Sequence, residues 1–242
     1  MLNDPQTYVE SLKSTEIRAL IRERRKLLKF IVQYNEKRNE RYRQIVDTYR
    51  SCKGETLSPS EDEKNAEEQQ YYTYLKYLSK LNELMDAKCV FEYETSASFV
   101  VEGEPVGDSI SLYESGEVVR RHLVFWDHDC IPKSETVLAT IPELAETIRS
   151  IINSHSRQLK NIPSILRNGT LDGSCDCFRF GDKTITAWTI QRTDPSEVKK
   201  RNPEYYRHFK KNMEYENTVL DIYDEIAEVI NAANAKIYLP KF

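Results

Sequence analysis

Apolar residues in the first third of the chain follow a heptad pattern, with alternating steps of four and three residues. That spacing is typical of a coiled-coil seam and predicts one long helix over residues 7–51. Polar residues within a seam lower stability but can fix register and partner choice. Seven of the ten positions are apolar, and the full series is Ile17, Ile21, Arg24, Leu28, Ile31, Asn35, Arg38, Tyr42, Ile45 and Tyr49.

A polar segment separates this helix from a second one. Gly54 can end the first helix, and Ser58-Pro59-Ser60-Glu61 has the form of a capping box with proline at the first helical position. The second helix is expected over about residues 59–86. Two helices joined by a short polar loop pack antiparallel. Residues 1–87 are therefore expected to form a coiled-coil helical hairpin. Its second seam would comprise Tyr71, Tyr74, Leu78, Leu81 and Met85.

From Lys88 onward the hydrophobic period changes to two, which indicates strands. The pattern predicts an α+β domain over residues 88–242, with an antiparallel sheet covered by two helices and the hairpin projecting from its N-terminal edge. A helix is expected from Pro142 to about Lys160, and a longer helical segment over 195–234 with a break at Pro203. The expected strands cover residues 88–95, 97–101, 109–113, 117–126, 135–141, 175–181, 183–191 and, at an edge, 236–242.

The composition of the sequence limits the cellular compartments in which this protein is expected. No stretch approaches the ~18 to 20 apolar residues that span a bilayer, and the N-terminus lacks the basic and apolar regions of a secretory signal. Five scattered cysteines are typical of reduced thiols rather than of a disulfide framework. A cytoplasmic protein with no membrane partner is expected.

Charge is uneven between the two predicted helices. Twelve Lys or Arg stand against five acids between Lys13 and Arg50, whereas seven acids stand against three lysines between residues 61 and 86. A basic face of this kind can neutralise nucleic-acid phosphates. Antiparallel packing would instead set acids of the second helix beside arginines of the first. We expect the second arrangement, and nucleic-acid binding along the basic helix is the alternative.

The spacing of arginine and histidine suggests one enzymatic alternative. Arg149 and His155, separated by five residues on a predicted helix, resemble the core of the motif in HEPN ribonucleases, where such a pair would activate a ribose 2′-hydroxyl. Arg201 with His208 and Arg121 with His128 have similar spacings, but the first pair spans a proline and the second lies on a strand. Matches this short also arise by chance. A structural His155 near a helix C-terminus, where a cation is favourable, is the simpler interpretation.

A second cluster contains metal-ligating residue types. His128, Asp129 and Cys130 are adjacent, and Cys175 and Cys177 could approach them if both hairpins shared a sheet. Zinc would need three or four such ligands converging at about 2.0 to 2.3 Å. There is no CxxC pair, however, and strand alternation sends both later cysteines to one face. A polar loop is the simpler interpretation, and no metal or cofactor is expected.

The sequence contains no glycine-rich phosphate loop, nucleophile elbow or zinc-protease motif. It does contain fifteen tyrosines, a residue type enriched at interfaces. We therefore expect a non-enzymatic interaction module that presents the hairpin to a protein partner or to a second copy of itself. Such a module could be a regulator or inhibitor of a larger cytoplasmic machine, for example one encoded by a phage or plasmid. The expected binding residues, all taken as exposed, are Arg24, Arg25, Arg38, Arg41, Tyr72 and Tyr77.

Overall fold

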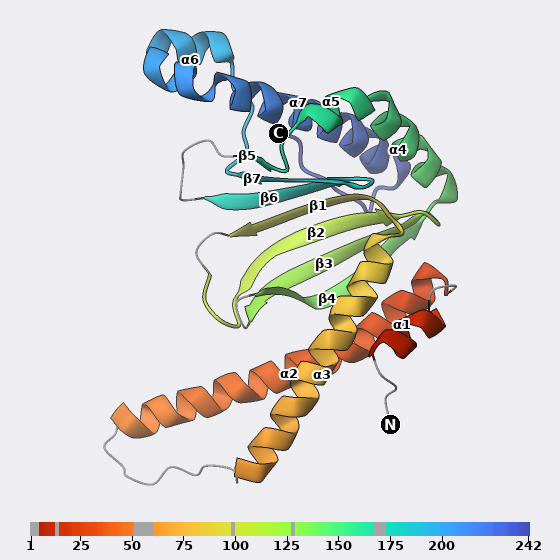
Figure 1. Ribbon diagram of the computed structural model, residues 1–242, viewed down its shortest axis with the longest axis vertical. Helices are drawn as coiled ribbons and strands as arrows, with labels where there is room; N and C mark the ends of the chain where they lie inside the picture. Colours follow the sequence, from red (N-terminus) through yellow and green to blue (C-terminus); the bar gives the residue numbers. More distant parts are fainter. Residues whose placement is uncertain (1–4, 13–14, 51–60, 98–99, 127–128, 167–172) are drawn as a thin grey trace. The chain divides into compact units, whose positions relative to one another are not determined.

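The structure is a computed structural model that describes residues 5–12, 15–50, 61–97, 100–126, 129–166 and 173–242 (Figure 1). It is an α+β protein, as expected, with helices and a seven-stranded, mostly antiparallel sheet. The chain divides into two compact units. The first comprises residues 1–87, 101–104 and 124–134, and the second comprises residues 88–100, 105–123 and 135–242. Two short segments of the sheet region therefore group with the N-terminal helices.

Three helices make up most of the first unit: α1 (Pro5–Leu12), α2 (Ile17–Arg50) and α3 (Glu61–Asp86). The expected single helix over 7–51 is wrong, because the chain leaves the helix after Leu12. The backbone N–H of Thr15 donates to Leu12 O at 2.9 Å, which makes a tight turn. This turn lets α1 pack on α3. Gly54 and the capping residues Ser58–Ser60 lie outside the described residues.

The seam between α2 and α3 follows the heptad pattern over its first half. Buried positions of α2 meet buried positions of α3, and the two helices run antiparallel, since Arg24 contacts Asn82 whereas Asn35 contacts Tyr71. Apolar burial along such a seam is the main source of hairpin stability. The buried apolar residues are Ile17, Leu20, Ile21, Leu27, Leu28 and Ile31 of α2 with Tyr71, Tyr77, Leu78, Leu81 and Met85 of α3.

The sheet has the strand order β4-β3-β2-β1-β6-β7-β5. Strand β1 pairs antiparallel with both β2 and β6, and β5 is parallel to β7. The expected strand over 97–101 is wrong, since β1 ends at Ala97 and Val100 and Val101 lie outside any strand. The strands are β1 (Cys89–Ala97), β2 (Pro105–Tyr113), β3 (Glu117–Trp126), β4 (Asp129–Thr140), β5 (Ile165–Leu166), β6 (Ser174–Phe180) and β7 (Lys183–Trp188).

The expected edge strand over 236–242 is also wrong. A side chain of the preceding helix satisfies the backbone there: Asn231 Nδ2 donates to Leu239 O at 2.9 Å, and Leu239 N donates to Asn231 Oδ1 at 2.7 Å. A strand would have needed a neighbouring strand for these groups. The final segment instead packs Ile237 and Leu239 into the core.

Four helices belong to the second unit: α4 (Pro142–Ser154), α5 (Ser156–Asn161), α6 (Pro195–Arg201) and α7 (Pro203–Ala233). The predicted helix over 142–160 is broken at His155, whose backbone leaves the helical region. The break at Pro203 is confirmed, and Asn202 caps α7 by accepting from Tyr205 N at 3.0 Å. None of the helices in the described ranges has the length and apolarity needed to cross a membrane.

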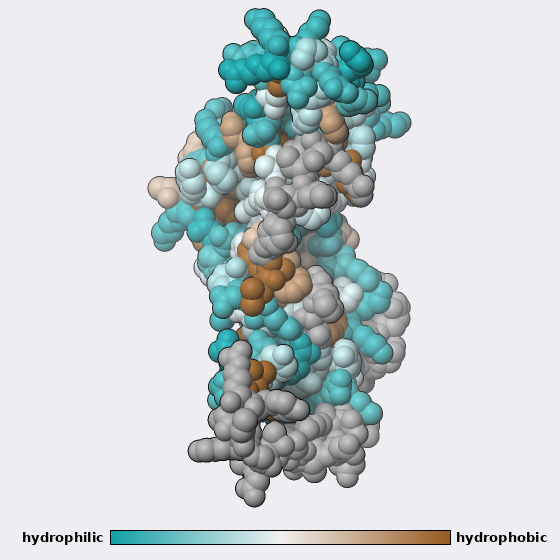
Figure 2. All heavy atoms as spheres, turned by 90° about the vertical axis from the view of Figure 1, so that its left-hand side faces the viewer, coloured by the Kyte–Doolittle hydropathy of each residue, from teal (hydrophilic) through white to brown (hydrophobic). Residues whose placement is uncertain are grey.

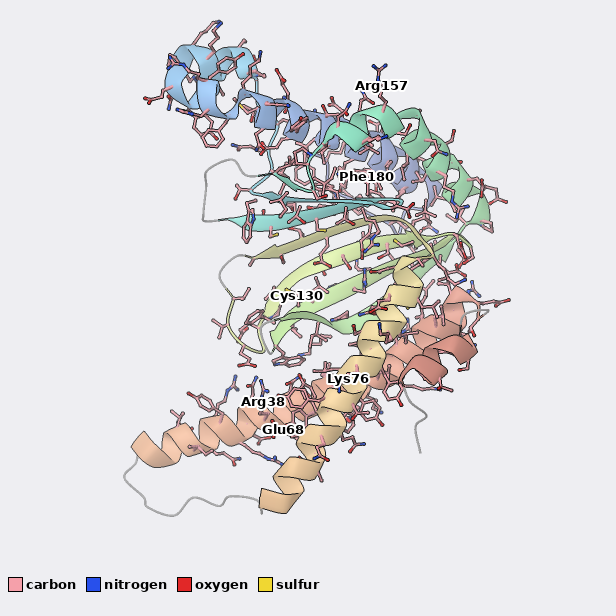
Figure 3. All side chains as sticks on the ribbon, in the orientation of Figure 1. Arg38, Glu68, Lys76, Cys130, Arg157 and Phe180 are labelled. Atoms are coloured by element: carbon pink, nitrogen blue, oxygen red, sulfur yellow. The ribbon has the colours of Figure 1, made fainter. Side chains whose placement is uncertain are left out.

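One face of the sheet forms the core of the second unit. Figure 1 shows α4, α5 and α7 over this face, and Phe180, labelled in Figure 3, points into it. An aromatic cluster fills its centre, where the ring of Tyr93 lies 4.9 Å from that of Tyr223 and 5.3 Å from that of Phe178. The Tyr93 hydroxyl donates to the buried Asp176 carboxylate at 3.0 Å. Each buried aromatic side chain removes a large apolar area from water.

The opposite face of the second unit's central strands is polar. Arg121 on β3 donates to the hydroxyls of Ser109 and Ser111 on β2 at 2.8 and 2.7 Å, and it pairs with the Glu92 carboxylate on β1. Arg179 on β6 approaches the other Glu92 oxygen at 3.5 Å. The network is nearly buried, so its charges are held by each other rather than by water. Arg121 is therefore a structural residue of the sheet.

Candidate interaction site on the helical hairpin

Two polar side chains lie inside the hairpin seam. Arg24 and Asn35 are both fully buried, so the expectation that Arg24 is an exposed binding residue is wrong. Its heptad position explains this, because the a and d positions of a seam point at the partner helix. Arg24 Nη1 donates to Asn82 Oδ1 at 3.3 Å, and Asn35 Nδ2 donates to the Tyr71 hydroxyl at 3.3 Å. Such groups fix which turn of α2 faces which turn of α3.

Aromatic rings fill the space around this seam. Tyr34 stacks on Tyr71 with ring centroids 4.4 Å apart, and Phe30 lies 4.4 Å from Tyr74. Tyr77 is buried, so the expectation that it is an exposed binding residue is also wrong. The reason is helix α1, which places Tyr8 edge-on against the Tyr77 ring at 4.9 Å. Without the turn after Leu12, this side of α3 would have faced water.

Part of the predicted seam is open to solvent. Tyr42 and Ile45 occupy heptad positions of α2, yet their exposed fractions are 67% and 48%. Tyr72 on α3 is 49% exposed, as expected for a binding residue. The second half of α2 thus departs from the seam that its sequence predicts. We call Tyr42, Ile45 and Tyr72 the exposed apolar set.

Acidic partners hold several cations of α2. Arg38, labelled in Figure 3, pairs with Glu102 at 2.5 Å, and Arg41 pairs with Glu67 on α3 at 3.2 Å. Lys37 lies 4.0 Å from the same Glu67. Arg38 and Arg41 are therefore half-buried residues with acids beside them, rather than free cations on an open surface. Pairs of this exposure contribute ~0 to 1 kcal/mol each.

Four cations form an exposed row on α2, which we call the basic row: Arg18, Arg22, Arg25 and Lys29. Their spacing of four, three and four residues places them along one side of the helix, over about 16 Å at 1.5 Å per residue. Arg25 is the one member that the sequence pattern had singled out, and it is exposed as expected.

The ribonuclease pair does not form a joint site. Arg149 on α4 pairs with Glu146 at 2.9 Å and with Glu114 at 3.8 Å. His155 ends α4, and its Nδ1 and Nε2 lie 2.7 Å from Gln158 and 2.8 Å from Glu225. Burial lowers the pKa of His155, but its hydrogen bonds to Gln158 and Glu225 and the charge of Glu225 outweigh that effect and raise the pKa. The two side chains thus bind separate partners: Arg149 links α4 to the turn between β2 and β3, and His155 links the end of α4 to α7.

The described candidate metal ligands, Cys130, Cys175 and Cys177, are not brought together. His128 and the side chain of Asp129 lie outside the described residues, and Cys130 is on β4. Cys175 and Cys177 are on β6, so strands β3, β2 and β1 lie between them and Cys130. Within the described ranges, no group of three metal-ligating side chains is close enough to hold an ion. The predicted alternation on β6 is correct, since the intervening Asp176 is buried in the core.

Glu216 is a buried acid that sequence reasoning did not single out. Glu216 on α7 is 2% exposed and lines a pocket beside α6. The sequence does contain a pattern that indicates this burial. Met213, Glu216, Leu220 and Tyr223 are spaced by steps of three and four residues, which places the Glu216 carboxylate within an apolar row of the helix. The sequence does not show that a cavity opens beside it, because the pocket walls come from separate segments.

No protein-family model matches the chain, and no curated protein matches it.

Proposed function

We propose that the helical hairpin is a docking arm for another protein, and that the chain is a non-enzymatic interaction module. The observation that carries this proposal is the exposed apolar set. Its three side chains leave much of their apolar area in water, while most of the described seam residues of α2 and α3 are buried. Large aromatic and aliphatic side chains in such settings are the usual anchors of protein interfaces.

The positive charge of α2 indicates what kind of partner surface would bind to the arm. Helix α2 holds eleven Lys or Arg and four acids, so it carries about seven positive charges at neutral pH. An apolar partner surface bordered by acids would match both features, and complementary charge speeds association and excludes basic competitors. A regulator or inhibitor of a larger cytoplasmic machine would have these properties. The five scattered cysteines, four of which are described as thiols, support a cytoplasmic location.

Affinity capture from the native host, followed by reconstitution, tests the proposal. The test variant carries Tyr42→Ser, Ile45→Ser and Tyr72→Ser. The matched control carries Ile165→Ser and Tyr238→Ser, which remove side chains of similar exposure, 55% and 69%, from the second unit. A partner captured by wild type and control should be purified and its affinity measured by calorimetry. The test variant should bind about tenfold more weakly or worse. Equal capture by all three proteins refutes the docking arm.

Nucleic-acid binding is the second candidate, and the basic row favours it. A row about 16 Å long could contact several successive phosphates. Fluorescence anisotropy with labelled duplex and single strands of DNA and RNA, at increasing salt, measures the number of contacts. Arg22→Gln with Lys29→Gln should reduce the log–log salt slope by about two, whereas Arg207→Gln with Lys236→Gln should not. Absence of binding at low salt eliminates this candidate.

A further inference from the structure

A pocket of about 290 Å³ lies in the second unit, between α6, the first half of α7 and the segment that precedes α6. Its size is near the lower end for ligand sites, so it suits a molecule of few heavy atoms. Figure 2 shows that the surface over α6 and the start of α7 is mainly hydrophilic. The pocket is lined by Gln191, Thr193, Val198, Arg201, Asn202, Tyr205, Met213 and Glu216.

Glu216 is the acid among the residues that line this pocket. Asn212 Nδ2 donates to its Oε1 at 3.0 Å, and no ion pair holds it in the described part of the chain. Burial raises the pKa of Glu216 to about 7, so it is partly ionised near neutral pH. An ionised carboxylate removed from water requires a cation or several donors to be stable. The single amide donor leaves most of that requirement unmet.

The other residues that line the pocket include both apolar and polar side chains. Tyr205 contributes an aromatic ring, which lies 4.6 Å from the ring of Phe209, and Val198 and Met213 contribute apolar surface. Gln191, Thr193 and Asn202 contribute hydroxyl and amide groups. A carboxylate beside an aromatic face is the combination that proteins use for organic cations.

Two further titratable groups border the carboxylate. Burial and the charge of Glu216 raise the pKa of Tyr205, which is therefore neutral at physiological pH. Arg201 contributes the cation among the residues that line the pocket, but its side chain is 81% exposed and lies 3.6 Å from Glu197. Water and that acid offset its charge. The buried negative charge is therefore what a ligand meets inside.

We propose that this pocket binds a small organic cation through a primary ammonium group, with Glu216 as the ion-pair partner and Tyr205 as the aromatic wall. An anion would be repelled by the carboxylate, and a neutral ligand would leave the carboxylate without a counter-charge. This proposal does not depend on the docking arm, since all of its residues belong to the second unit.

Binding should strengthen as pH rises, because only the ionised carboxylate pairs with the ligand. With a pKa of about 7, the ionised fraction of Glu216 increases about tenfold between pH 6 and pH 8. The dissociation constant of an ammonium ligand should fall by about the same factor. Tyr205 stays neutral across this range, since burial and the charge of Glu216 raise its pKa, so it does not contribute.

Titration of the full chain with n-butylamine tests the proposal, with 1-butanol as the neutral isostere. Binding is followed by amide chemical shifts in NMR and by calorimetry. Saturable binding of n-butylamine alone is expected, about tenfold or more weakened in Glu216→Gln. The matched control is Glu214→Gln, which removes an exposed acid of α7 and should bind as wild type. Should Glu216→Gln not fold, the pH series on the wild-type chain decides. Equal binding of both probes, no saturable binding at pH 8, an unchanged Glu216→Gln or a pH-independent affinity would each overturn the proposal.

Discussion

Substitution of Glu216 by glutamine should stabilise the protein in a pH-dependent manner. In the folded chain, burial raises the pKa of Glu216 from 4.5 to about 7. Between these values the folded state holds a proton that the unfolded state has lost. Stability contributed by the protonated acid is thus fully present below pH 4.5 and is lost as pH rises through 7. Each pH unit in that window lowers the free energy of unfolding by up to about 1.4 kcal/mol.

The size of the effect follows from these two pKa values. Glutamine resembles the protonated acid but does not ionise. The stability of the variant therefore does not fall as pH rises from 4.5 through 7. Its advantage over wild type should grow by about 2.5 kcal/mol between pH 5 and pH 8. Urea unfolding of both proteins at these pH values, followed by circular dichroism, measures it, with Glu214→Gln as the exposed control. An advantage that is constant with pH, or that shrinks toward pH 8, would show that Glu216 is not held in a desolvated site.

Three other substitutions test parts of the fold by the same urea titration. Asn35→Leu should raise the free energy of unfolding by about 1 kcal/mol, because no described residue bonds the buried Asn35 Oδ1; a comparable loss would contradict this. Arg121→Leu should lower the free energy of unfolding by about 3 kcal/mol by leaving Glu92 without its main cation, and adding Glu92→Leu should restore most of the loss. If the double variant is no more stable than the single one, the pair is not coupled. Gly116→Ala should cost about 2 kcal/mol, since Gly116 has φ +89° and a Cβ would meet the Ile141 carbonyl; an unchanged midpoint would contradict that strain.

Local periodicity was enough to predict most elements. The heptads of α2, the period of two in the strands and the proline before α7 are each readable from a few adjacent residues. The turn after Leu12 was not predicted, because no glycine or proline between Leu12 and Ile17 marks a break in the helix. The burial of Tyr77 depends on that turn. Local patterns therefore specify helices better than they specify which helix folds back on another.

The candidate sites were less predictable for the same reason. The charge of Arg24 favours an exposed position, whereas its heptad position favours burial, because a and d positions face inward whatever their residue type. The heptad pattern predicts that Tyr42 and Ile45 belong to the seam, but the seam does not extend to them. The Glu216 pocket joins residues that are up to 25 positions apart, from Gln191 to Glu216. Only the tertiary structure reveals that combination.

The position of β1 in the middle of the sheet has a consequence for synthesis of the chain. Its partner β2 emerges soon after it, whereas β6 on its other side begins at Ser174, 85 residues after Cys89. Until then, one long edge of β1 has unpaired backbone groups, and Phe91 and Tyr93 lack the rings of Phe180 and Phe178. An incomplete nascent chain therefore carries an aggregation-prone strand edge while residues 98–173 are synthesised. Premature termination before Trp188 should yield aggregates rather than a smaller folded product.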